Sequence, residues 1–449
     1  MQYRRDDTIA ALATAPGHGA VAIVRVSGPA AGAIGRALGG IEPRARYAEL
    51  CTFRDGEGQR IDRGLLLSFP APNSYTGEDV VELHCHGGRV VGDLLLARAY
   101  ALGARPAEPG EFTLRAFLND KLDLLQAEAV ADLVASGSGV AARAALRSLD
   151  GQFSVAVGEL QAGLTELRVR IEAWLDFPDE ELPFGAGGEC AATIDTLGAR
   201  LHALTAQARQ GSVLRDGLSV AIAGPPNAGK SSLLNRLAGY DAAIVTDVPG
   251  TTRDPLREHL TLGGLPITIV DTAGLREAAD PVEREGLRRT HVEVGRADRV
   301  LWVADVREPL DATAAAARAA LGAQVAFTVV RNKIDLADGR AAATELGDLH
   351  VVRISALTGA GLDLVTTHLQ TLAGFSPEVA GTFSARRRHL DALTRAQRHL
   401  VAARAELDQA LELAAEELRG AQAALGELTG ELTSDDLLGE IFSTFCIGK

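Results

Sequence analysis

The sequence predicts a multidomain protein: an N-terminal α+β domain, an all-α helical domain, and an α/β domain with a mostly parallel sheet that is inserted into the helical one. Strand-like segments dominate the first 118 residues, whereas segments rich in Ala, Leu, Arg and Glu at helical spacing occur on both sides of the chain's middle. Between these helical parts, apolar strands alternate with helical patterns. We therefore expect an N-terminal domain at 1–118, a first helical part at 119–216, the inserted domain at 217–376 and a second helical part at 377–449.

Length and charge limit what the chain can do. Its 449 residues can hold about two to four domains, and its net charge of −14 argues against a protein that grips a phosphate backbone across its whole surface. Contact with nucleic acid must therefore be local or supplied by a partner. Four widely separated cysteines favour a reduced, cytoplasmic setting. We find no signal-peptide pattern and no run of about 18 apolar residues, so no membrane span is expected.

Lysine is rare in this chain. Only four of the 45 basic residues are lysines, namely Lys121, Lys230, Lys333 and Lys449. A chain that uses arginine almost everywhere is expected to keep lysine where a compact ammonium is needed, although chance retention on the surface is the alternative.

The N-terminal domain carries a polar strand face. In the strand predicted for residues 80–88, Glu82, His84 and His86 point to one side and the apolar residues to the other. Such a face is usually only solvated, but a carboxylate and two imidazoles beside glycines better suit a small-molecule pocket. A metal site at His84, Cys85 and His86 is disfavoured, because Cys85 points away from the histidines. We also expect strands at 8–14, 20–27 (with Arg25 in an apolar run) and 64–69, and a helix at 90–102.

The helical domain is expected to be interrupted at two turn-rich points, Gly211-Ser212 and residues 374–381. Residues 176–181 end one helix, 193–210 form another, and the pattern resumes over 384–426. The second part holds a basic cluster, which we interpret first as a solvated helix face and second as a contact for RNA or a partner. Its members are Arg386, Arg387, Arg388, Arg395 and Arg398.

The chain ends in the apolar segment IFSTFCIGK, preceded by a possible helix N-cap at Ser434. Side chains such as Phe442 and Phe445 are not expected to stay in water, so the tail should dock and carry Cys446 and Lys449 with it. A chemical role for Cys446 stays open.

The inserted domain begins with SVAIAGPPNAGKSSLLNRLAG, which starts at Ser219. An apolar strand, a turn bounded by Gly224 and Gly229, and a helical pattern follow one another, as in a P-loop. The N–H groups of such a turn and the helix N-terminus converge on a di- or triphosphate. Lys230 adds a positive charge, and the Ser231 hydroxyl can bind Mg²⁺.

Three later motifs indicate a guanine nucleotide. Asp271-Thr272-Ala273-Gly274 follows an apolar strand and suits an Asp that reaches Mg²⁺ and a Gly that senses the γ-phosphate. Asn332-Lys333-Ile334-Asp335 follows another, and its last carboxylate can accept hydrogen bonds from guanine N1–H and from the N2 amine that adenine lacks. Ser355-Ala356-Leu357 suits the guanine O6 edge. We therefore predict a Ras-like, GTP-binding P-loop domain. Its GTP-binding residues are predicted to be Asn227, Ala228, Gly229, Lys230, Ser231, Ser232, Thr246, Asp247, Val248, Pro249, Gly250, Thr251, Thr252, Asp271, Thr272, Ala273, Gly274, Asn332, Lys333, Asp335, Ser355, Ala356 and Leu357.

The motifs also bear on hydrolysis. Leu275 stands where signalling GTPases have the glutamine that orients water, so a carboxylate in the loop 280–286 must take over. The amide oxygen of Asn227 could bind a cation beside the phosphates, although a turn-stabilising role is the alternative. The loop 246–252 is long enough to add backbone carbonyls to that cation and Thr252 to Mg²⁺. We expect GTP turnover to be much faster in K⁺ than in Na⁺.

Along its whole length, the chain resembles the tRNA-modification GTPases of the MnmE (TrmE) family. The stretches that carry the resemblance are DTIAALATAPGHGAVAIVRVSG, NSYTGEDVVELHCHGG, PGEFTLRAFLNDKLDLLQAEAVADL, GPPNAGKSSLLNRLAG, TDVPGTTRD, DTAGLRE, VEREG, NKID and FCIGK.

The resemblance implies an N-terminal domain that dimerises and binds a tetrahydrofolate one-carbon donor in its 5-formyl or 5,10-methylene form. It also implies GTP hydrolysis activated by K⁺-dependent pairing of two GTPase domains. Hydrolysis would drive aminomethyl or carboxymethylaminomethyl addition at C5 of the wobble uridine (U34) of certain tRNAs, in a heterotetramer with the FAD-containing partner MnmG. The family's positions map onto Arg25, Glu82, Lys121 and Lys449 for folate; Asn227, Thr246, Val248 and Thr251 for K⁺; Ser231 and Thr252 for Mg²⁺; and Glu283 for orienting water.

Two departures and one alternative accompany this resemblance. Pro225 stands where the family often has Arg, and His84-Cys85 stands where it often has Gln-Gly, which can alter the lining of the folate pocket. The alternative is a regulatory GTPase switch, for example in ribosome assembly. The first 118 residues and the CIGK tail argue against a pure switch, and the absence of long heptad runs argues against a polymerising GTPase.

Overall fold

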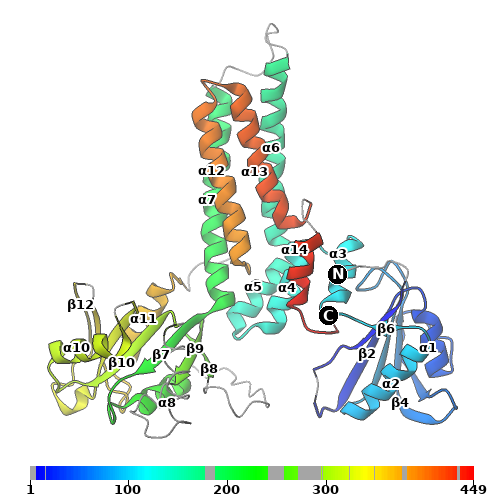
Figure 1. Cartoon of the computed structure of the whole chain (residues 1–449), viewed down its shortest axis with the longest axis horizontal. Helices are drawn as coiled ribbons and strands as arrows, with labels where there is room; N and C mark the ends of the chain where they lie inside the picture. The colour runs from blue at the N-terminus through cyan, green and yellow to red at the C-terminus, as the bar shows by residue number, and fades with distance from the viewer. Residues whose placement is uncertain are drawn as a thin grey trace. The chain divides into compact units, whose positions relative to one another are not determined.

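The computed structural model describes residues 7–15, 17–176, 188–240, 257–271, 295, 297–322, 324–347, 349–376, 382–431 and 435–448. The chain forms two compact units, whose sheets and helices are seen in Figure 1. The first unit comprises residues 1–131, 148–198 and 395–449, and the second comprises 132–147 and 199–394. In the described part of the chain, no helix has both the length and the apolar character that crossing a membrane requires.

The first unit contains a six-stranded sheet in the order β3-β4-β5-β2-β1-β6. Neighbouring strands are antiparallel except for β1 and β6, which are parallel. The four strands expected from sequence are confirmed, and β3 is an additional edge strand in which Cys51 and Phe53 are buried. The bounds are β1 (Ile9–Leu12), β2 (Val21–Ser27), β3 (Glu49–Arg54), β4 (Arg60–Phe69), β5 (Val80–His86) and β6 (Arg105–Pro106).

Two helices, α1 (Ala31–Gly39) and the expected α2 (Arg89–Ala101), pack on one face of this sheet (Figure 1). The first forms in a Gly/Ala-rich segment because Ile34 and Leu38 are buried in the core that it shares with the sheet. Gly35 lies so close to the sheet that a Cβ there would be 3.0 Å from a methyl carbon of Val81.

The opposite face of the sheet is partly open and carries exposed aliphatic side chains beside the polar ones of β5. Side chains alternate between faces along a strand. The residues directly before and after each core residue therefore point to this opposite face. Cross-strand register aligns Leu50 with Leu65, Leu65 with His84, and His84 with Ile23. Leu50 is 60% exposed, Leu65 38% and the nearby Val21 55%. Leu50 and Leu65 are direct cross-strand neighbours, and exposed aliphatic side chains gathered on one face are typical of an interaction surface.

The remaining helices of the first unit form a bundle and a short C-terminal cap. The long helices α6 and α13 pack against each other (Figure 1). Helix α6 is described as far as Asp176, and the rest of the predicted break over 176–181 lies outside the described residues. Helices α4, α5, α7 and α12 have residues in both units. The bounds are α3 (Glu111–Leu118), α4 (Leu124–Ala135), α5 (Gly139–Leu149), α6 (Gln152–Asp176), α7 (Gly188–Asp216), α12 (Arg387–Glu406), α13 (Leu411–Thr429) and α14 (Asp435–Ser443).

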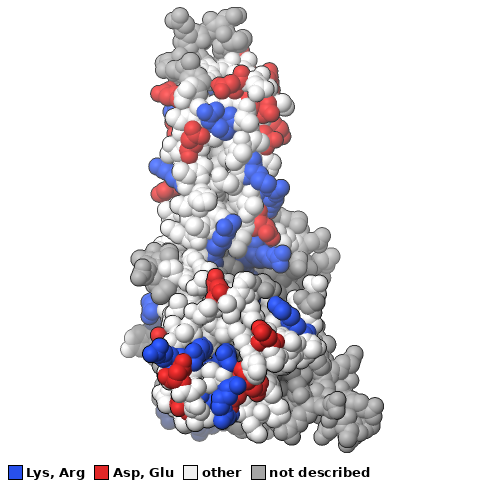
Figure 2. All heavy atoms as spheres, turned by 90° about the vertical axis from the view of Figure 1, so that its left-hand side faces the viewer, with Lys and Arg blue, Asp and Glu red and all other residues white. Residues whose placement is uncertain are grey.

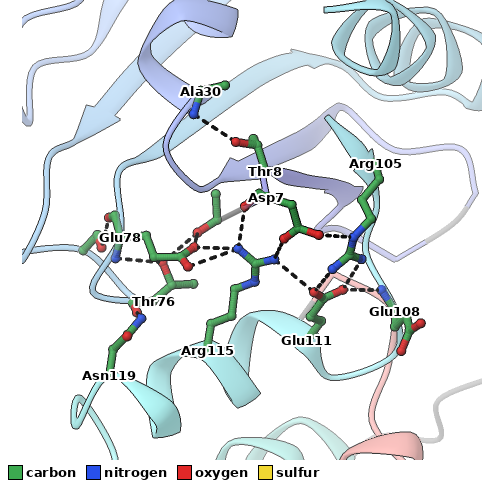
Figure 3. Close-up of polar contacts among 12 residues, drawn as sticks. Asp7, Thr8, Ala30, Thr76, Glu78, Arg105, Glu108, Glu111, Arg115 and Asn119 are labelled. Carbon is green, nitrogen blue, oxygen red and sulfur yellow. Dashed lines mark hydrogen bonds and ion pairs between the residues drawn. The ribbon is translucent and has the colours of Figure 1, made fainter. Parts of the chain in front are cut away.

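A buried ionic network holds the N-terminal segments together (Figure 3). The side chain of Arg115 is fully buried and pairs with Asp7 at 2.5 Å, Glu78 at 3.0 Å and Glu111 at 3.1 Å. Arg105 pairs with Asp7 at 2.6 Å and with Glu111 at 2.5 Å. The network therefore joins α3 to β6, to the loop before β5 and to the segment that leads into β1.

The prediction that the C-terminal tail docks is confirmed. Ile441, Phe442 and Phe445 are buried in a cluster with Leu114 of α3 and Leu124 of α4. Ser434 lies outside the described residues.

The second unit is built on a seven-stranded sheet in the order β12-β13-β11-β10-β7-β9-β8. The five inner strands are parallel and the two edge strands, β8 and β12, are antiparallel to their neighbours, which confirms the mostly parallel sheet. The strands are β7 (Leu218–Ala223), β8 (Arg257–Leu262), β9 (Leu265–Asp271), β10 (Arg299–Asp305), β11 (Phe327–Asn332), β12 (Ala342–Leu346) and β13 (Leu349–Arg353). The helices are α8 (Lys230–Tyr240), α10 (Leu310–Leu321), a 3₁₀ turn η1 (Ile334–Leu336) and α11 (Leu362–Leu372).

The predicted turn at Gly211-Ser212 is wrong, because α7 continues through it almost to β7. Gly211 is required by a close approach instead: a Cβ there would lie 1.8 Å from the carbonyl oxygen of Phe383. The chain therefore leaves the helical part at the end of α7 and returns past the same helix.

The arginine cluster of α12 is only partly a solvated face. The guanidinium of Arg386 pairs with the buried carboxylate of Asp132 at 2.9 Å, and Arg395 makes two hydrogen bonds to the carboxylate of Glu427. Arg387, by contrast, is exposed.

Candidate functional site

The phosphate-binding loop has the expected strand–turn–helix form. It joins β7 to α8, and Gly224, Asn227 and Gly229 have positive φ angles of 142°, 60° and 97°. Gly224 is required because a Cβ there would lie 2.0 Å from the carbonyl oxygen of Val303 in β10. Lys230 Nζ donates to the carbonyls of Gly224 and Pro225 at 2.9 and 2.8 Å, which holds the ammonium over the loop. Ser231 and Ser232 are exposed in the first turn of α8.

Asn332 connects three of the predicted motifs. Its side chain is buried, and Nδ2 donates to the carbonyl of Ala228 in the phosphate-binding loop at 2.9 Å. Its Oδ1 accepts from the N–H of Lys333 at 2.8 Å and from the N–H of Ala356 at 2.9 Å. The approach is close enough that a Cβ at Gly229 would lie 2.2 Å from Asn332 Nδ2. The hydrogen bonds of Asn332 therefore fix the phosphate-binding motif and the two predicted base-binding motifs relative to one another.

The two predicted base-contacting segments also meet. The Ser355 hydroxyl donates to Asp335 Oδ1 at 2.5 Å, and the N–H of Thr358 donates to the same hydroxyl oxygen at 3.1 Å. Leu357 is 75% exposed at the end of this segment. The carboxylate of Asp335 is thus positioned by a hydroxyl and stays exposed toward solvent.

Sequence reasoning missed two residues that position Lys333. Asp305, at the end of β10, pairs with Lys333 Nζ at 3.1 Å and with the guanidinium of Arg307 at 2.7 Å. Hydrogen bonds from Arg307 and Lys333 hold the pKa of Asp305 well below its usual range, against the opposing effect of burial. Asp305 could have been proposed as a site residue from the sequence, because it ends an apolar strand, as Asp271 does.

Several predicted nucleotide and ion ligands cannot be placed. Residues 246–252, 272–274 and Glu283 lie outside the described residues, as does the side chain of Asp271. The backbone of Asp271 ends β9 in register with Ile222 of β7, so its position beside the phosphate-binding loop agrees with the prediction.

A second candidate site is centred on Arg25 of β2 and Glu82 of β5, which are direct cross-strand partners. Glu82 Oε1 accepts from Arg25 Nε and Nη2, both at 2.9 Å. The guanidinium lies 5.5 Å from the ring centre of Tyr75 and 5.6 Å from that of Phe112. Arg25 Nη1 also donates to the carbonyl of Gly448 at 3.4 Å. A charged pair is thereby surrounded by two aromatic rings and the docked C-terminal tail.

The other predicted members of this site lie at its edge or beyond the description. Lys121 is exposed, and a Cβ at Gly77 would lie 3.3 Å from its Cγ, so its stem packs on the loop that carries Tyr75. Lys449 is outside the described residues, but it follows Gly448, which contacts Arg25. Of the four predicted positions, Arg25 and Glu82 are thus in direct contact, and Lys121 lies against the loop that carries Tyr75.

The polar face of β5 forms as expected. Glu82 Oε2 and His84 Nε2 are 3.2 Å apart, and His86 Nδ1 and Asp62 Oδ1 are 2.8 Å apart. Cys85 points into the core, and burial raises the pKa of its thiol to about 11. Within the described ranges, no cluster of three or more His, Cys, Asp or Glu residues could hold a metal ion.

Two protein-family models together match most of the chain. The model of the MnmE helical domain matches residues 124–446, and that of the GTP-binding protein TrmE N-terminus matches residues 8–121. The chain is 56% identical to the tRNA modification GTPase MnmE of Alkalilimnicola ehrlichii over 444 residues, which is 98% of this chain and 99% of the relative. It is 54% identical to the MnmE of Nitrosococcus oceani over 448 residues (99% and 98%) and 53% identical to that of Yersinia pseudotuberculosis over 451 residues (99% and 99%).

One family model spans more than half of the chain, and each of these relatives is more than half identical to it over nearly its full length. The chain therefore belongs to the MnmE (TrmE) family of tRNA modification GTPases.

Proposed function

We propose that this chain is a K⁺-activated GTPase that works in the cytoplasm with the FAD-containing protein MnmG to modify C5 of the wobble uridine of certain tRNAs. A tetrahydrofolate derivative supplies the one-carbon unit, and the two proteins form a heterotetramer. The observation that carries the proposal is the Arg25–Glu82 pair, enclosed by Tyr75 and Phe112 and met by the C-terminal tail. A GTPase that acted only as a switch has no need of it.

The residues of this second site suit a folate. The Glu82 carboxylate is an acceptor for the amino and ring N–H groups of a pterin, and the rings of Tyr75 and Phe112 offer surfaces for a flat heterocycle. Arg25 and Lys121 supply positive charge for the anionic glutamate tail. We assign Lys449 to the same site because it directly follows Gly448, whose carbonyl contacts Arg25.

The nucleotide site suits GTP with Mg²⁺ and a monovalent cation. Ser231 and Thr252 are the proposed Mg²⁺ ligands, and Asn227, Thr246, Val248 and Thr251 are the proposed K⁺ ligands. In support, Asn227 stands in the turn that leads to Lys230, where its short amide side chain is compatible with a φ of 60°. Glu283 is the proposed water-orienting carboxylate.

The proposed homodimer is supported by the open sheet face of the first unit. Val21, Leu50 and Leu65 expose aliphatic side chains there, and covering them with a second copy would remove apolar surface from water. The site residues Arg25 and Glu82 lie on the same face of the sheet, one register row from the apolar one.

Equilibrium binding of 5-formyltetrahydrofolate tests the small-molecule site. The substitution Glu82→Gln replaces an acceptor by an amide that also donates, so we expect affinity to fall about 10- to 100-fold. Lys121→Ala should weaken binding by removing one charge. Glu57→Gln, in an exposed turn of the same domain, is the matched control and should bind like wild type. No binding by wild type would favour the alternative, a regulatory GTPase switch such as one in ribosome assembly.

Analysis of the wobble uridine in a deletion strain tests the cellular role. We expect the C5 modification of the affected tRNAs to disappear with the gene and to return on complementation. Complementation by the Lys230→Ala variant should fail, since the phosphate-binding ammonium is lost. Normal modification in the deletion strain would exclude the proposed role.

A further inference from the structure

A groove runs between α7 and α12 in the second unit, beside the end of α11. We call it the α7–α12 groove, and its volume is about 440 Å³. The residues that matter for its chemistry are His202, Thr205, Arg209, Ser212, Gly374 and Leu390.

The charge of this groove differs from that of the chain. No acidic residue is among the described residues that line it, although the chain has 59 Asp and Glu against 45 Lys and Arg. His202 and Arg209 are seven positions apart on α7, so they lie on one face of that helix. On α12, Arg387 precedes Leu390 by three positions and shares its face. The nearest acid on that helix is Asp391, which is exposed.

The two arginines are available for a ligand. Within the part of the chain that the structure describes, neither Arg209 nor Arg387 is within ion-pair distance of a carboxylate, and both are exposed. Figure 2 shows several Lys and Arg side chains, with acidic ones among them, on the surface of the helices.

The wall of the groove connects the helices to the nucleotide-binding fold. The side-chain amide of Gln210 donates to the carbonyl of Gly374, just beyond α11, and accepts from the N–H of Ser376 at 3.0 Å. An occupant of the groove would therefore touch α7, α12 and the last turn of the GTPase fold at once.

We propose that the α7–α12 groove binds the phosphate backbone of RNA and that this RNA is the tRNA substrate. Guanidinium groups match phosphate oxygens with two parallel hydrogen bonds. The hydroxyls of Thr205 and Ser212 are already engaged as donors, to the carbonyl of Leu201 and to the carboxylate of Asp216, which itself pairs with Arg215. In a chain with net charge −14, a polyanion can approach only where acids are locally absent. Salt screens charges beyond about 8 Å at physiological ionic strength, so distant carboxylates do not cancel this groove. The identity of the RNA as tRNA rests on the proposed function.

Binding of a labelled, unmodified tRNA transcript to the full-length chain over a series of salt concentrations tests the proposal. We expect the double variant Arg209→Glu/Arg387→Glu to bind at least about tenfold more weakly than wild type at physiological salt. Its log–log salt dependence should be shallower by about two, because two phosphate contacts are removed. GTP turnover without tRNA should be unchanged, which shows that the variant is folded.

The control is the double variant Arg143→Glu/Arg340→Glu, which changes the net charge equally at exposed positions that do not line the groove. If tRNA affinity falls equally in this control, the effect is one of total charge, and the proposal is overturned. Unchanged tRNA affinity in the groove variant, or an absence of salt-dependent tRNA binding by wild type, would overturn it as well. Loss of MnmG binding with tRNA affinity intact would assign the groove to a protein partner and also overturn it.

The outcome is separable from that of the proposed function. If the groove variant loses tRNA affinity but the gene is dispensable for wobble modification, the groove proposal stands and the proposed function is wrong. If modification requires the gene but the groove variant binds tRNA like wild type, the proposed function stands and the groove proposal is wrong.

Discussion

Replacing Asn227 with glycine is expected to remove the activation of GTP turnover by K⁺ while leaving GDP affinity nearly unchanged. Asn227 has a φ of 60°, which glycine adopts without strain, so this substitution deletes the amide without disturbing the loop. When an arginine supplies the positive charge beside the phosphates, that charge is worth about 10³-fold or more in rate. We therefore expect a loss of at least about tenfold in K⁺ buffer. Hydrolysis rates in K⁺ and in Na⁺ at equal ionic strength are the measurement.

The neighbouring substitution Pro226→Ala is the control for this experiment. Pro226 is exposed in the same loop and offers no side-chain oxygen, so the response to K⁺ should persist. Wild-type turnover that is equally fast in Na⁺ and K⁺ would contradict the cation hypothesis. A K⁺ response retained by the Asn227→Gly variant would show that the ion, if present, is held by other ligands.

Replacing Arg115 with methionine is expected to destabilise the N-terminal part of the first unit by about 3–5 kcal/mol, the usual cost of leaving buried charges unpaired. Arg115 is fully buried and pairs with Asp7, Glu78 and Glu111. Without it, Arg105 would be the remaining cation of this network. Hydrogen exchange of the peptides that cover residues 105–118 should report the loss as faster opening.

Arg36→Met is the matched control, because Arg36 pairs with Glu42 in an exposed position where ion pairs contribute little. Hydrogen exchange of the Arg115→Met variant that equals that of wild type would show that the network does not stabilise this region.

The same network predicts a dependence on pH. Burial by itself raises the pKa values of Asp7 and Glu111, but hydrogen bonds and charges from Arg105 and Arg115 outweigh it, and both pKa values are lowered. A carboxylate with a lowered pKa stabilises the folded state above its unfolded pKa of about 4, and this contribution is lost as the pH falls through the folded value. The stability difference between wild type and the Arg115→Met variant should therefore narrow as the pH is lowered from 7 toward 3. A constant difference would contradict this account.

The nucleotide-binding fold was readable from sequence because its signals are local. A strand, a glycine-bounded turn and a helix follow one another directly at residues 218–240, and both predicted bounding glycines, Gly224 and Gly229, have positive φ angles. The alternation along β5 likewise placed Glu82 and His84 on one face and Cys85 in the core. In these cases the physical cause, backbone geometry and side-chain period, acts over a few neighbouring residues.

Sequence reasoning failed where a residue's role depends on a distant segment. Gly211 looked like a turn, but it lies within a helix and is small because the carbonyl of Phe383 would be 1.8 Å from a Cβ. Arg386 looked solvated, but it pairs with Asp132 at 2.9 Å. No local pattern distinguishes a glycine needed for close packing from one needed for a turn.

Order along the chain was thus sufficient for the family, for the GTP-binding motifs and for the mostly parallel sheet of the inserted domain. Folding in three dimensions was needed to bring the carbonyl of Gly448 to Arg25, to link Asn332 with Ala228 and Ala356, and to enclose Arg115 among three carboxylates. The physical reason is that hydrogen bonds and ion pairs between remote segments form only after packing has excluded water and brought those segments together, and periodicity in the sequence does not encode which segments meet.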